Sequence, residues 1–176
     1  LTWTGIPEAD ANDYISTGCH NPTIPAKTHD IGGSSFNYPL ILELTLNRGV
    51  CRATGEKLGL DLGAPETFAD FRDLLDAFET QFEYVMKRLF YFKNADLMLY
   101  EQFPCPLLSS FYEGCMEQGR DIHEYGVRTT HTSAFAGAPN VGDSLAAIKK
   151  TVYDDKTLTW GRLLSLLDRD LEGDDE

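Results

Sequence analysis

The chain has 176 residues, of which 42% are hydrophobic and 24% are charged, which suits one packed domain and excludes intrinsic disorder of the whole. Its formal net charge of −13 at pH 7 would repel nucleic-acid phosphates and anionic lipid surfaces. No apolar run approaches the roughly 18 residues that a membrane span needs. We therefore expect neither nucleic acid nor a membrane among its partners.

The N-terminal part of the chain predicts loops around one short helix. Leu1–Ser35 is rich in Gly, Pro, Asn and Asp, and we expect it to be a loop with little regular structure. Pro39–Asn47 is apolar on nearly all sides, which predicts a deeply buried helix that ends at Arg48-Gly49. Val50–Glu66 contains several glycines and a proline, and these residues indicate an exposed loop.

The longest helix is predicted over Thr67–Gln102. Apolar side chains, many of them aromatic, recur there at three- and four-residue steps. Thr67 followed by Asp70 resembles a capping box at its start, and Asn94 marks an expected irregularity. The aromatic stripe at this spacing is interpreted as core packing.

The C-terminal part of the chain predicts further helices separated by a loop at Arg120–Pro139. Asn140 and Thr159 are the candidate capping residues of the last two helices. The chain is thus mostly helix with long loops, whose backbone groups need hydrogen-bond partners. An isolated domain would leave many of these loop groups without partners, which indicates missing sequence on one or both sides. The helices are predicted over Pro106–Gln118, Val141–Asp154 and Trp160–Leu171.

The cysteines and histidines do not form a metal-binding pattern. No cysteine pair has CxxC spacing, so reduced thiols are expected and a zinc site is not. No histidine pair has the helical i, i+4 spacing of a metalloprotease, and no phosphate-binding glycine motif or GxSxG motif is present. We therefore expect no metal. The residues concerned are Cys19, Cys51, Cys105, Cys115, His20, His29, His123 and His131.

Cys19 follows Gly18 in a tight loop bounded by Pro22, and several chemistries fit it. With His29 as base it could be a thiolate nucleophile. His20 is a poor base for it, because adjacent side chains in an extended loop point in opposite directions. A neutral thiol in a dry pocket could instead donate a hydrogen atom through a thiyl radical. A buried, inert cysteine is the third interpretation.

Four separated stretches of the chain share sequence with one family. Asn140–Lys150 is similar to NVADSLAAIKK, and Phe36–Gly49 is similar to FN…LELxLNxG. Gly18–Thr28 falls where many members have GCVEPxxPGKT, and Pro106–Cys115 matches another shared block. By these motifs, in this order and spacing, the chain resembles the glycyl radical enzymes of the pyruvate formate-lyase-like (PFL) group.

The resemblance implies a fold. Family members are ten-stranded α/β barrels built from two half-barrels, and their chains are several-fold longer. Residues 1–176 would then be the C-terminal part of a PFL-like lyase domain, truncated at both ends. This segment of the α/β barrel is expected to be mostly helical, with long loops and few short strands.

The resemblance also implies a mechanism. A glycyl radical takes the hydrogen atom of an active-site cysteine, here Cys19, and the thiyl then takes one from a small-molecule substrate. This radical would lie on the missing C-terminal part, installed by a separate S-adenosylmethionine and iron–sulfur activating enzyme. The present segment is expected to bind no cofactor itself. Anaerobic, cytoplasmic life is implied, and members are commonly homodimers.

Two departures from the family pattern bear on activity. Dehydratases and related lyases of the family have a Glu two residues after the cysteine, where this chain has Asn21. Asparagine cannot act as a general acid or base, so a reaction needing that carboxylate would require Asp30 or a residue outside the chain. The family's RVxG-like radical loop is also missing, so this segment alone is expected to be inactive.

The preferred hypothesis is a lyase that breaks or forms a C–C or C–X bond in a small organic acid or alcohol. Formate C-acetyltransferase, dehydratase and arylsuccinate-synthase types remain open. The alternatives are a non-catalytic relative that binds a ligand or partner, and a cysteine-dependent hydrolase. The substrate-binding candidates are His20, Asn21, His29 and Asp30.

Overall fold

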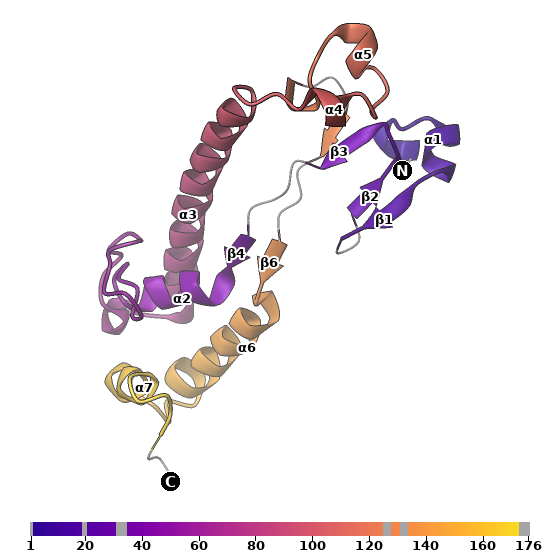
Figure 1. Ribbon diagram of the computed structural model, residues 1–176. Coiled ribbons are helices and arrows are strands. Elements are labelled where there is room, and N and C mark those ends of the chain that lie inside the picture. Colours follow the sequence, from indigo (N-terminus) through magenta and orange to yellow (C-terminus); the bar gives the residue numbers. More distant parts are fainter. Residues whose placement is uncertain (1, 19–20, 31–34, 125–127, 131–133, 173–176) are drawn as a thin grey trace. The chain divides into compact units, whose positions relative to one another are not determined.

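The computed structural model describes residues 2–18, 21–30, 35–124, 128–130 and 134–172. Contacts divide the chain into two compact units. The first, which we call the hairpin unit, comprises residues 1–35 and 89–134, and the second, the helical unit, comprises residues 36–88 and 135–176 (Figure 1). Three elements contribute residues to both units: α3 (Phe71–Tyr100), β4 (Ser35–Asn37) and β6 (Ala134–Ala136).

Short elements build the hairpin unit. β1 pairs antiparallel with β2, and β3 pairs parallel with β5. The expectation that residues 1–35 form a loop with little regular structure is wrong, because η1, α1 and β1–β3 lie there. Strands of three residues are too short to show an alternating pattern, and the partner of β3 lies far along the chain. The unit contains η1 (Thr2–Thr4), α1 (Glu8–Asn12), β1 (Ile15–Thr17), β2 (Asn21–Thr23), β3 (Thr28–Asp30), α4 (Pro106–Ser109), α5 (Cys115–Gln118), η3 (Ile122–Glu124) and β5 (Arg128–Thr130).

The helix predicted over Pro106–Gln118 is broken into α4 and α5. Gly114 precedes α5 with a left-handed φ of 91°, and Gly119 ends α5, as predicted, with a φ of 61°. The break has a tertiary cause: the Ser109 hydroxyl donates to Asp121 at 2.7 Å and accepts from the amide of Ile122 at 3.1 Å. These long-range bonds hold the end of α4 to the segment that follows α5.

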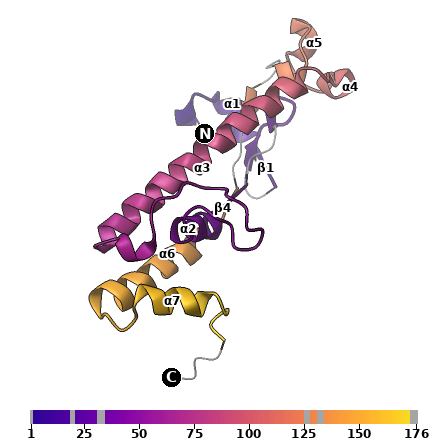
Figure 2. The same ribbon diagram turned by 90° about the vertical axis from the view of Figure 1, so that its left-hand side faces the viewer.

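Helices build the helical unit, in which α2, α6 and α7 lie side by side (Figures 1 and 2). The predicted helix over Pro39–Asn47 is confirmed as α2, within one residue at each end. Asn37 caps it by accepting from the amide of Leu40 at 3.2 Å. The elements of this unit are α2 (Tyr38–Leu46), η2 (Pro65–Thr67), the first part of α3, α6 (Ala138–Ile148), η4 (Lys149–Asp154, a π-helical turn) and α7 (Trp160–Leu167).

The long helix α3 begins later than predicted. Asp70, not Thr67, caps it, because the Asp70 carboxylate accepts from the amides of Arg72 at 2.8 Å and Asp73 at 3.0 Å. Thr67 belongs to η2 instead. No irregularity occurs at Asn94, where the helix is continuous.

The apolar stripe of α3 is buried or half-buried in the first half of the helix only. Leu74 is completely buried and packs with Phe68, Ile148 and Trp160 in the core of the helical unit. In the second half, the exposed fractions are 55% for Phe90, 68% for Met98 and 58% for Leu99. The prediction of core packing is therefore wrong for this part of the helix. Among the described residues, no helix is both long and apolar enough to cross a bilayer.

The loop between α2 and η2 is held to α3 by a buried glutamine. Gln81 is fully buried, and its side-chain oxygen accepts from the amide of Leu60 at 3.0 Å. A Cβ at Gly59 would lie 1.9 Å from the Gln81 amide nitrogen, and Gly49 has a left-handed φ of 80°. Both positions therefore require glycine, and the predicted exposed loop packs closely at this point.

The predicted C-terminal helices are found with shifted ends. α6 begins at Ala138 behind Gly137, whose φ is 78°, so Asn140 is not its cap. Thr159 caps α7 as predicted, accepting from the amide of Arg162 at 3.2 Å. α7 ends at Leu167, earlier than the predicted Leu171.

Candidate functional site

The β1–β2 hairpin positions the residues on either side of Cys19. Thr17 and Asn21 are paired across its two strands. The Thr17 hydroxyl donates to the Asn21 carbonyl at 3.3 Å, and it lies 2.7 Å from the Thr23 hydroxyl. Gly18 has a left-handed φ of 53°. Cys19 and His20 themselves lie outside the described residues. The structure thus fixes the two ends of the short stretch that contains them.

A second contact joins this hairpin to β3. The Asn21 side-chain amide donates to the carboxylate of Asp30 at 2.8 Å, and both residues are half-buried. The two predicted site residues are nine positions apart, and the structure brings them into direct contact.

The turn between β2 and β3 is held by buried and charged partners. Thr28 is 5% exposed, and its hydroxyl accepts from the amide of Ile24 at 2.9 Å. The Lys27 ammonium forms an ion pair with Asp10 at 2.7 Å and lies 3.5 Å from Glu113. Hydrogen bonding and attraction to Asp10 raise the pKa of Lys27. These contacts anchor the turn that carries β3.

His29 lies on the other side of β3 within a group of rings. Its imidazole meets the Tyr112 ring edge-on at 5.6 Å and the His123 ring at 5.5 Å between centroids, and Tyr100 stacks on His123 at 5.0 Å. Burial, and then the proximity of His123, lower the pKa of His29, while Asp30 and Asp121 oppose the shift. His29 is therefore neutral at pH 7.

Asp121 organises the backbone around these rings. Its carboxylate accepts from the amide of Cys105 at 2.7 Å, from the hydroxyl of Ser109 at 2.7 Å and from the amide of His123 at 3.0 Å. Burial acts to raise its pKa, but these hydrogen bonds outweigh burial and hold the pKa of Asp121 below its usual range. The residue stays ionised and is a structural anchor.

This network could not be predicted from the sequence. Asp121 lies in the predicted loop at Arg120–Pro139, and nothing in the neighbouring sequence distinguishes a buried acceptor from a solvated acid. Cys115 is 2% exposed, and burial raises the pKa of its thiol. Within the part of the chain that the structure describes, no group of three or more His, Cys, Asp or Glu could hold a metal ion.

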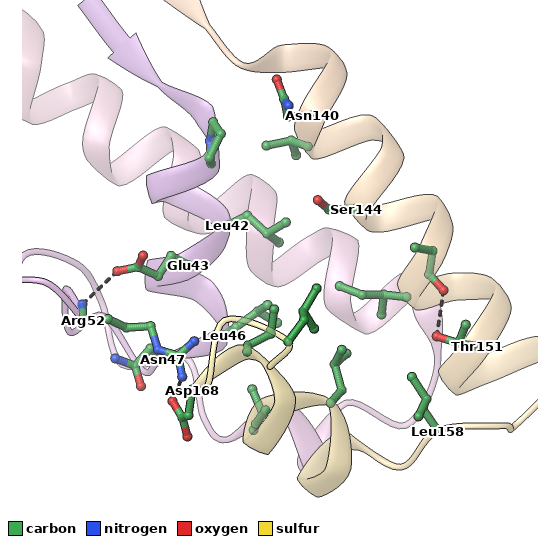
Figure 3. Close-up of a pocket in the computed structure, with 18 residues that line it drawn as sticks. Leu42, Glu43, Leu46, Asn47, Arg52, Asn140, Ser144, Thr151, Leu158 and Asp168 are labelled. Atoms are coloured by element: carbon green, nitrogen blue, oxygen red, sulfur yellow. Dashed lines mark hydrogen bonds and ion pairs between the residues drawn. The ribbon is translucent and has the colours of Figure 1, made fainter. Parts of the chain in front are cut away.

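A separate cavity of about 570 Å³ lies in the helical unit, between α2, α6 and α7 (Figure 3). Its lining is mainly aliphatic, with Leu42, Leu46 and Leu158 among the contributors. At one edge Arg52 forms an ion pair with Asp168, and the Arg52 amide donates to Glu43 at 2.8 Å. The lining contains no cysteine or histidine among the described residues.

Comparisons with known proteins cover the whole chain. The family model described as pyruvate formate lyase-like matches residues 1–176. A (2S)-3-sulfopropanediol dehydratase of Klebsiella oxytoca is 32% identical over 163 residues, which are 91% of this chain and 20% of that enzyme.

Two solved structures resemble the chain closely. The hydroxyproline dehydratase of Clostridioides difficile with trans-4-hydroxy-L-proline bound has a TM-score of 0.90 at 30% identity, covering 99% of this chain and 22% of its own. The B12-independent glycerol dehydratase of Clostridium butyricum in its glycerol-bound form has a TM-score of 0.85 at 30% identity. The match covers 98% of this chain and 22% of the dehydratase chain. The chain spans about a fifth of the length of these relatives. The expected fold class, an α/β segment of such a barrel, is confirmed.

Proposed function

Because the chain belongs to the pyruvate formate lyase-like family of glycyl radical enzymes, we propose that it is the cysteine-bearing segment of a lyase for a small hydroxylated substrate. Residues 1–176 are one part of the lyase domain, and the parent supplies the rest. The observation that carries the proposal is the match of nearly the whole chain to a substrate-bound dehydratase, with a TM-score of 0.90. The comparisons give no support to the alternative of a non-catalytic scaffold.

Cys19 is the proposed hydrogen-atom carrier. The chemistry of the family depends on a glycyl radical, which would reside in another part of the parent and would supply the unpaired electron. Cys19 then exchanges one hydrogen atom with a substrate carbon, breaking C–H and forming S–H, and later returns it to the product. Its flanking residues Thr17 and Asn21 are paired, so the ends of its loop have a fixed separation. A preorganised loop of this kind reduces the entropy that is lost when the reacting atoms are brought together.

The remaining site residues have proposed roles on the same strands. Asn21 and Asp30 provide an amide and a carboxylate that can bind substrate hydroxyl groups, and His29 provides a neutral imidazole. His20 adjoins Cys19 in the sequence and completes the proposed substrate-binding set. A pocket with both donors and acceptors suits a small polar substrate.

The proposed partners follow from the same chemistry. They are a small-molecule substrate, a separate activating enzyme that uses S-adenosylmethionine and an iron–sulfur cluster, and a second copy of the parent in a homodimer. We place the parent in the anaerobic cytoplasm, where a carbon radical and a free thiol persist.

The test is product formation by the activated parent protein. Cys19→Ala abolishes turnover, because alanine lacks the thiol whose hydrogen atom is transferred. Cys105→Ala is the matched control, since Cys105 is a partly exposed cysteine of the same unit and its variant keeps turnover. Full activity of Cys19→Ala would overturn the proposal.

A further inference from the structure

The cavity between α2, α6 and α7 is too large to be a packing defect (Figure 3). Its volume is about 570 Å³, whereas native protein cores have few voids larger than a water molecule. Part of its lining is buried, since Leu42 and Ile148 are each 6% exposed. Leu164 and Leu167 of α7 are only half-buried, and Leu171 is 61% exposed. Aliphatic side chains gathered in this way are stabilised when another apolar surface covers them.

Several polar groups in the lining of this cavity are bonded to other parts of the protein. The Thr151 hydroxyl donates to the carbonyl of Ala147 at 2.8 Å, and the Asn47 side-chain amide donates to a backbone carbonyl at 2.8 Å. At one edge, Arg52 forms its ion pair with Asp168. Because these groups already have partners, an apolar occupant matches the cavity better than a hydrophilic small molecule does.

The place of the cavity along the chain indicates which segment covers it. The chain spans about a fifth of the length of its relatives, so most of the parent lies outside it. Leu171, the exposed leucine of the lining, stands only a few positions before Glu176. Neighbouring helices of a bundle are commonly joined by about two to eight residues. A segment that follows Glu176 can therefore reach the cavity through an ordinary helix–helix connection.

Other sources of an apolar occupant are less favourable. Residues 172–176 have the sequence Glu-Gly-Asp-Asp-Glu, and acidic side chains are almost never buried without a partner, so these residues suit the connection and not the cavity. A parent segment before residue 1 would continue from the hairpin unit, and it is not tethered beside the cavity of the helical unit. A second copy would lose translational and rotational freedom on binding, a cost that a tethered segment avoids.

We propose that the parent segment immediately after Glu176 forms a helix whose aliphatic side chains fill the cavity. A short connection and one helix of average length place this occupant within about 25 residues of Glu176. Ser144 and Ala147 of α6 line the cavity and are exposed, and their small side chains allow the backbone of another helix to approach closely. The inference goes beyond the proposed function and does not depend on the radical chemistry.

The experiment is site-specific photo-crosslinking in the intact parent. Ala147 is replaced by a diazirine analogue of leucine, and the cross-linked peptides are identified by mass spectrometry. Ala146, the neighbouring exposed alanine of α6 that does not line the cavity, is the matched control. We expect the probe at position 147 to cross-link within about 25 residues after Glu176, and the probe at position 146 not to reach the same side chains. A mixture of ¹⁵N-labelled and unlabelled parent separates cross-links within one chain from those between copies.

Hydrogen exchange of the parent provides a second readout. Ala147→Trp inserts a large side chain where the proposed helix packs, and this overpacking accelerates the exchange of that helix by about tenfold or more. Ala146→Trp is the control, and it leaves the exchange of the same segment within about twofold of the unmodified parent. The cross-link decides the question if Ala147→Trp does not fold.

The outcomes are distinguishable. Cross-links from position 147 to any other segment of the parent, or to a second copy, overturn the proposal. Reaction of the probe with water alone also overturns it, because the cavity would then be open to solvent. Unchanged exchange in Ala147→Trp contradicts close packing of the segment against α6. None of these results bears on the proposed function, which the Cys19→Ala variant tests independently.

Discussion

The two units of the chain are stabilised by different interactions. The helical unit has an apolar core, in which Leu74 is completely buried against Phe68 and Trp160. The hairpin unit contains strands of three residues and depends on a polar network around the carboxylate of Asp121. The proposed site residues therefore lie where hydrogen bonds, more than apolar burial, fix the geometry. Such bonds are directional, and they hold side chains more precisely than apolar contacts do.

The largest expected effect is on the helical unit. Leu74→Ala removes a fully buried side chain, and large-to-small core substitutions of this kind cost about 2–5 kcal/mol. Urea denaturation measures the loss, and hydrogen exchange accelerates in α2, α6 and α7 but not in β1–β3. Leu99→Ala is the matched control on the same helix, where the side chain is 58% exposed, and it has little effect. Equal acceleration in both units would show that the units do not unfold separately.

A smaller effect is expected on the polar network of the hairpin unit. Ser109→Ala removes the donor to Asp121 and leaves the buried amide of Ile122 without its acceptor, at a cost of about 1–3 kcal/mol. Hydrogen exchange then increases around α4 and η3, with α2 unchanged. Ser110→Ala, at an exposed position next to it, is the control and stays within about 0.5 kcal/mol. A Ser109→Ala protein as stable as the control would contradict the anchoring role of Asp121.

The smallest expected effect is a dependence on pH. His29 has a lowered pKa in the folded state, so its contribution to stability is complete above its unfolded pKa of about 6.5 and is lost as pH falls through the lower folded value. Asp121 also has a lowered pKa, and its contribution is present above about pH 4 and lost at more acid pH.

Acidification from pH 7 to pH 5 therefore destabilises the hairpin unit before the helical unit. The measurement is the hydrogen-exchange rate of β3 and η3, corrected for the intrinsic effect of pH, and we expect this rate to increase. The rings of Tyr112 and His123 contact His29, and the charges of Asp30 and Asp121 also act on its pKa. His29→Phe keeps the ring contacts and removes the loss of stability that sets in as the pH falls below about 6.5. A step that persists in His29→Phe would assign it to another group.

Local signals predicted the helical unit better than the hairpin unit. α2 was predicted within one residue, because its apolar run and Pro39 are contained in the element itself. The start of α3 was misplaced because Thr67 and Asp70 both fit a cap, and only the amide bonds of the structure distinguish them. The break between α4 and α5 depends on Asp121, which is distant in sequence from Ser109.

The candidate site could be predicted as a set of residues but not as a geometry. Asn21, His29 and Asp30 are candidates because they follow Cys19 in one loop, which falls where the family has its cysteine motif, although Asn21 departs from that motif. The Asn21–Asp30 bond depends on the turn between β2 and β3, and no spacing rule gives it. The rings of Tyr112 and His123 reach His29 from far along the chain, so no local pattern could reveal them.

Cys19 is proposed to carry a hydrogen atom between a protein radical and a substrate carbon. The measurement is the electron paramagnetic resonance spectrum of the activated parent carrying Cys19→Ala, recorded together with product formation from a substrate that the unmodified parent converts. We expect the glycyl radical signal to form at the level of the unmodified protein while no product appears. Product formation by this variant at the rate of the unmodified protein would contradict the account.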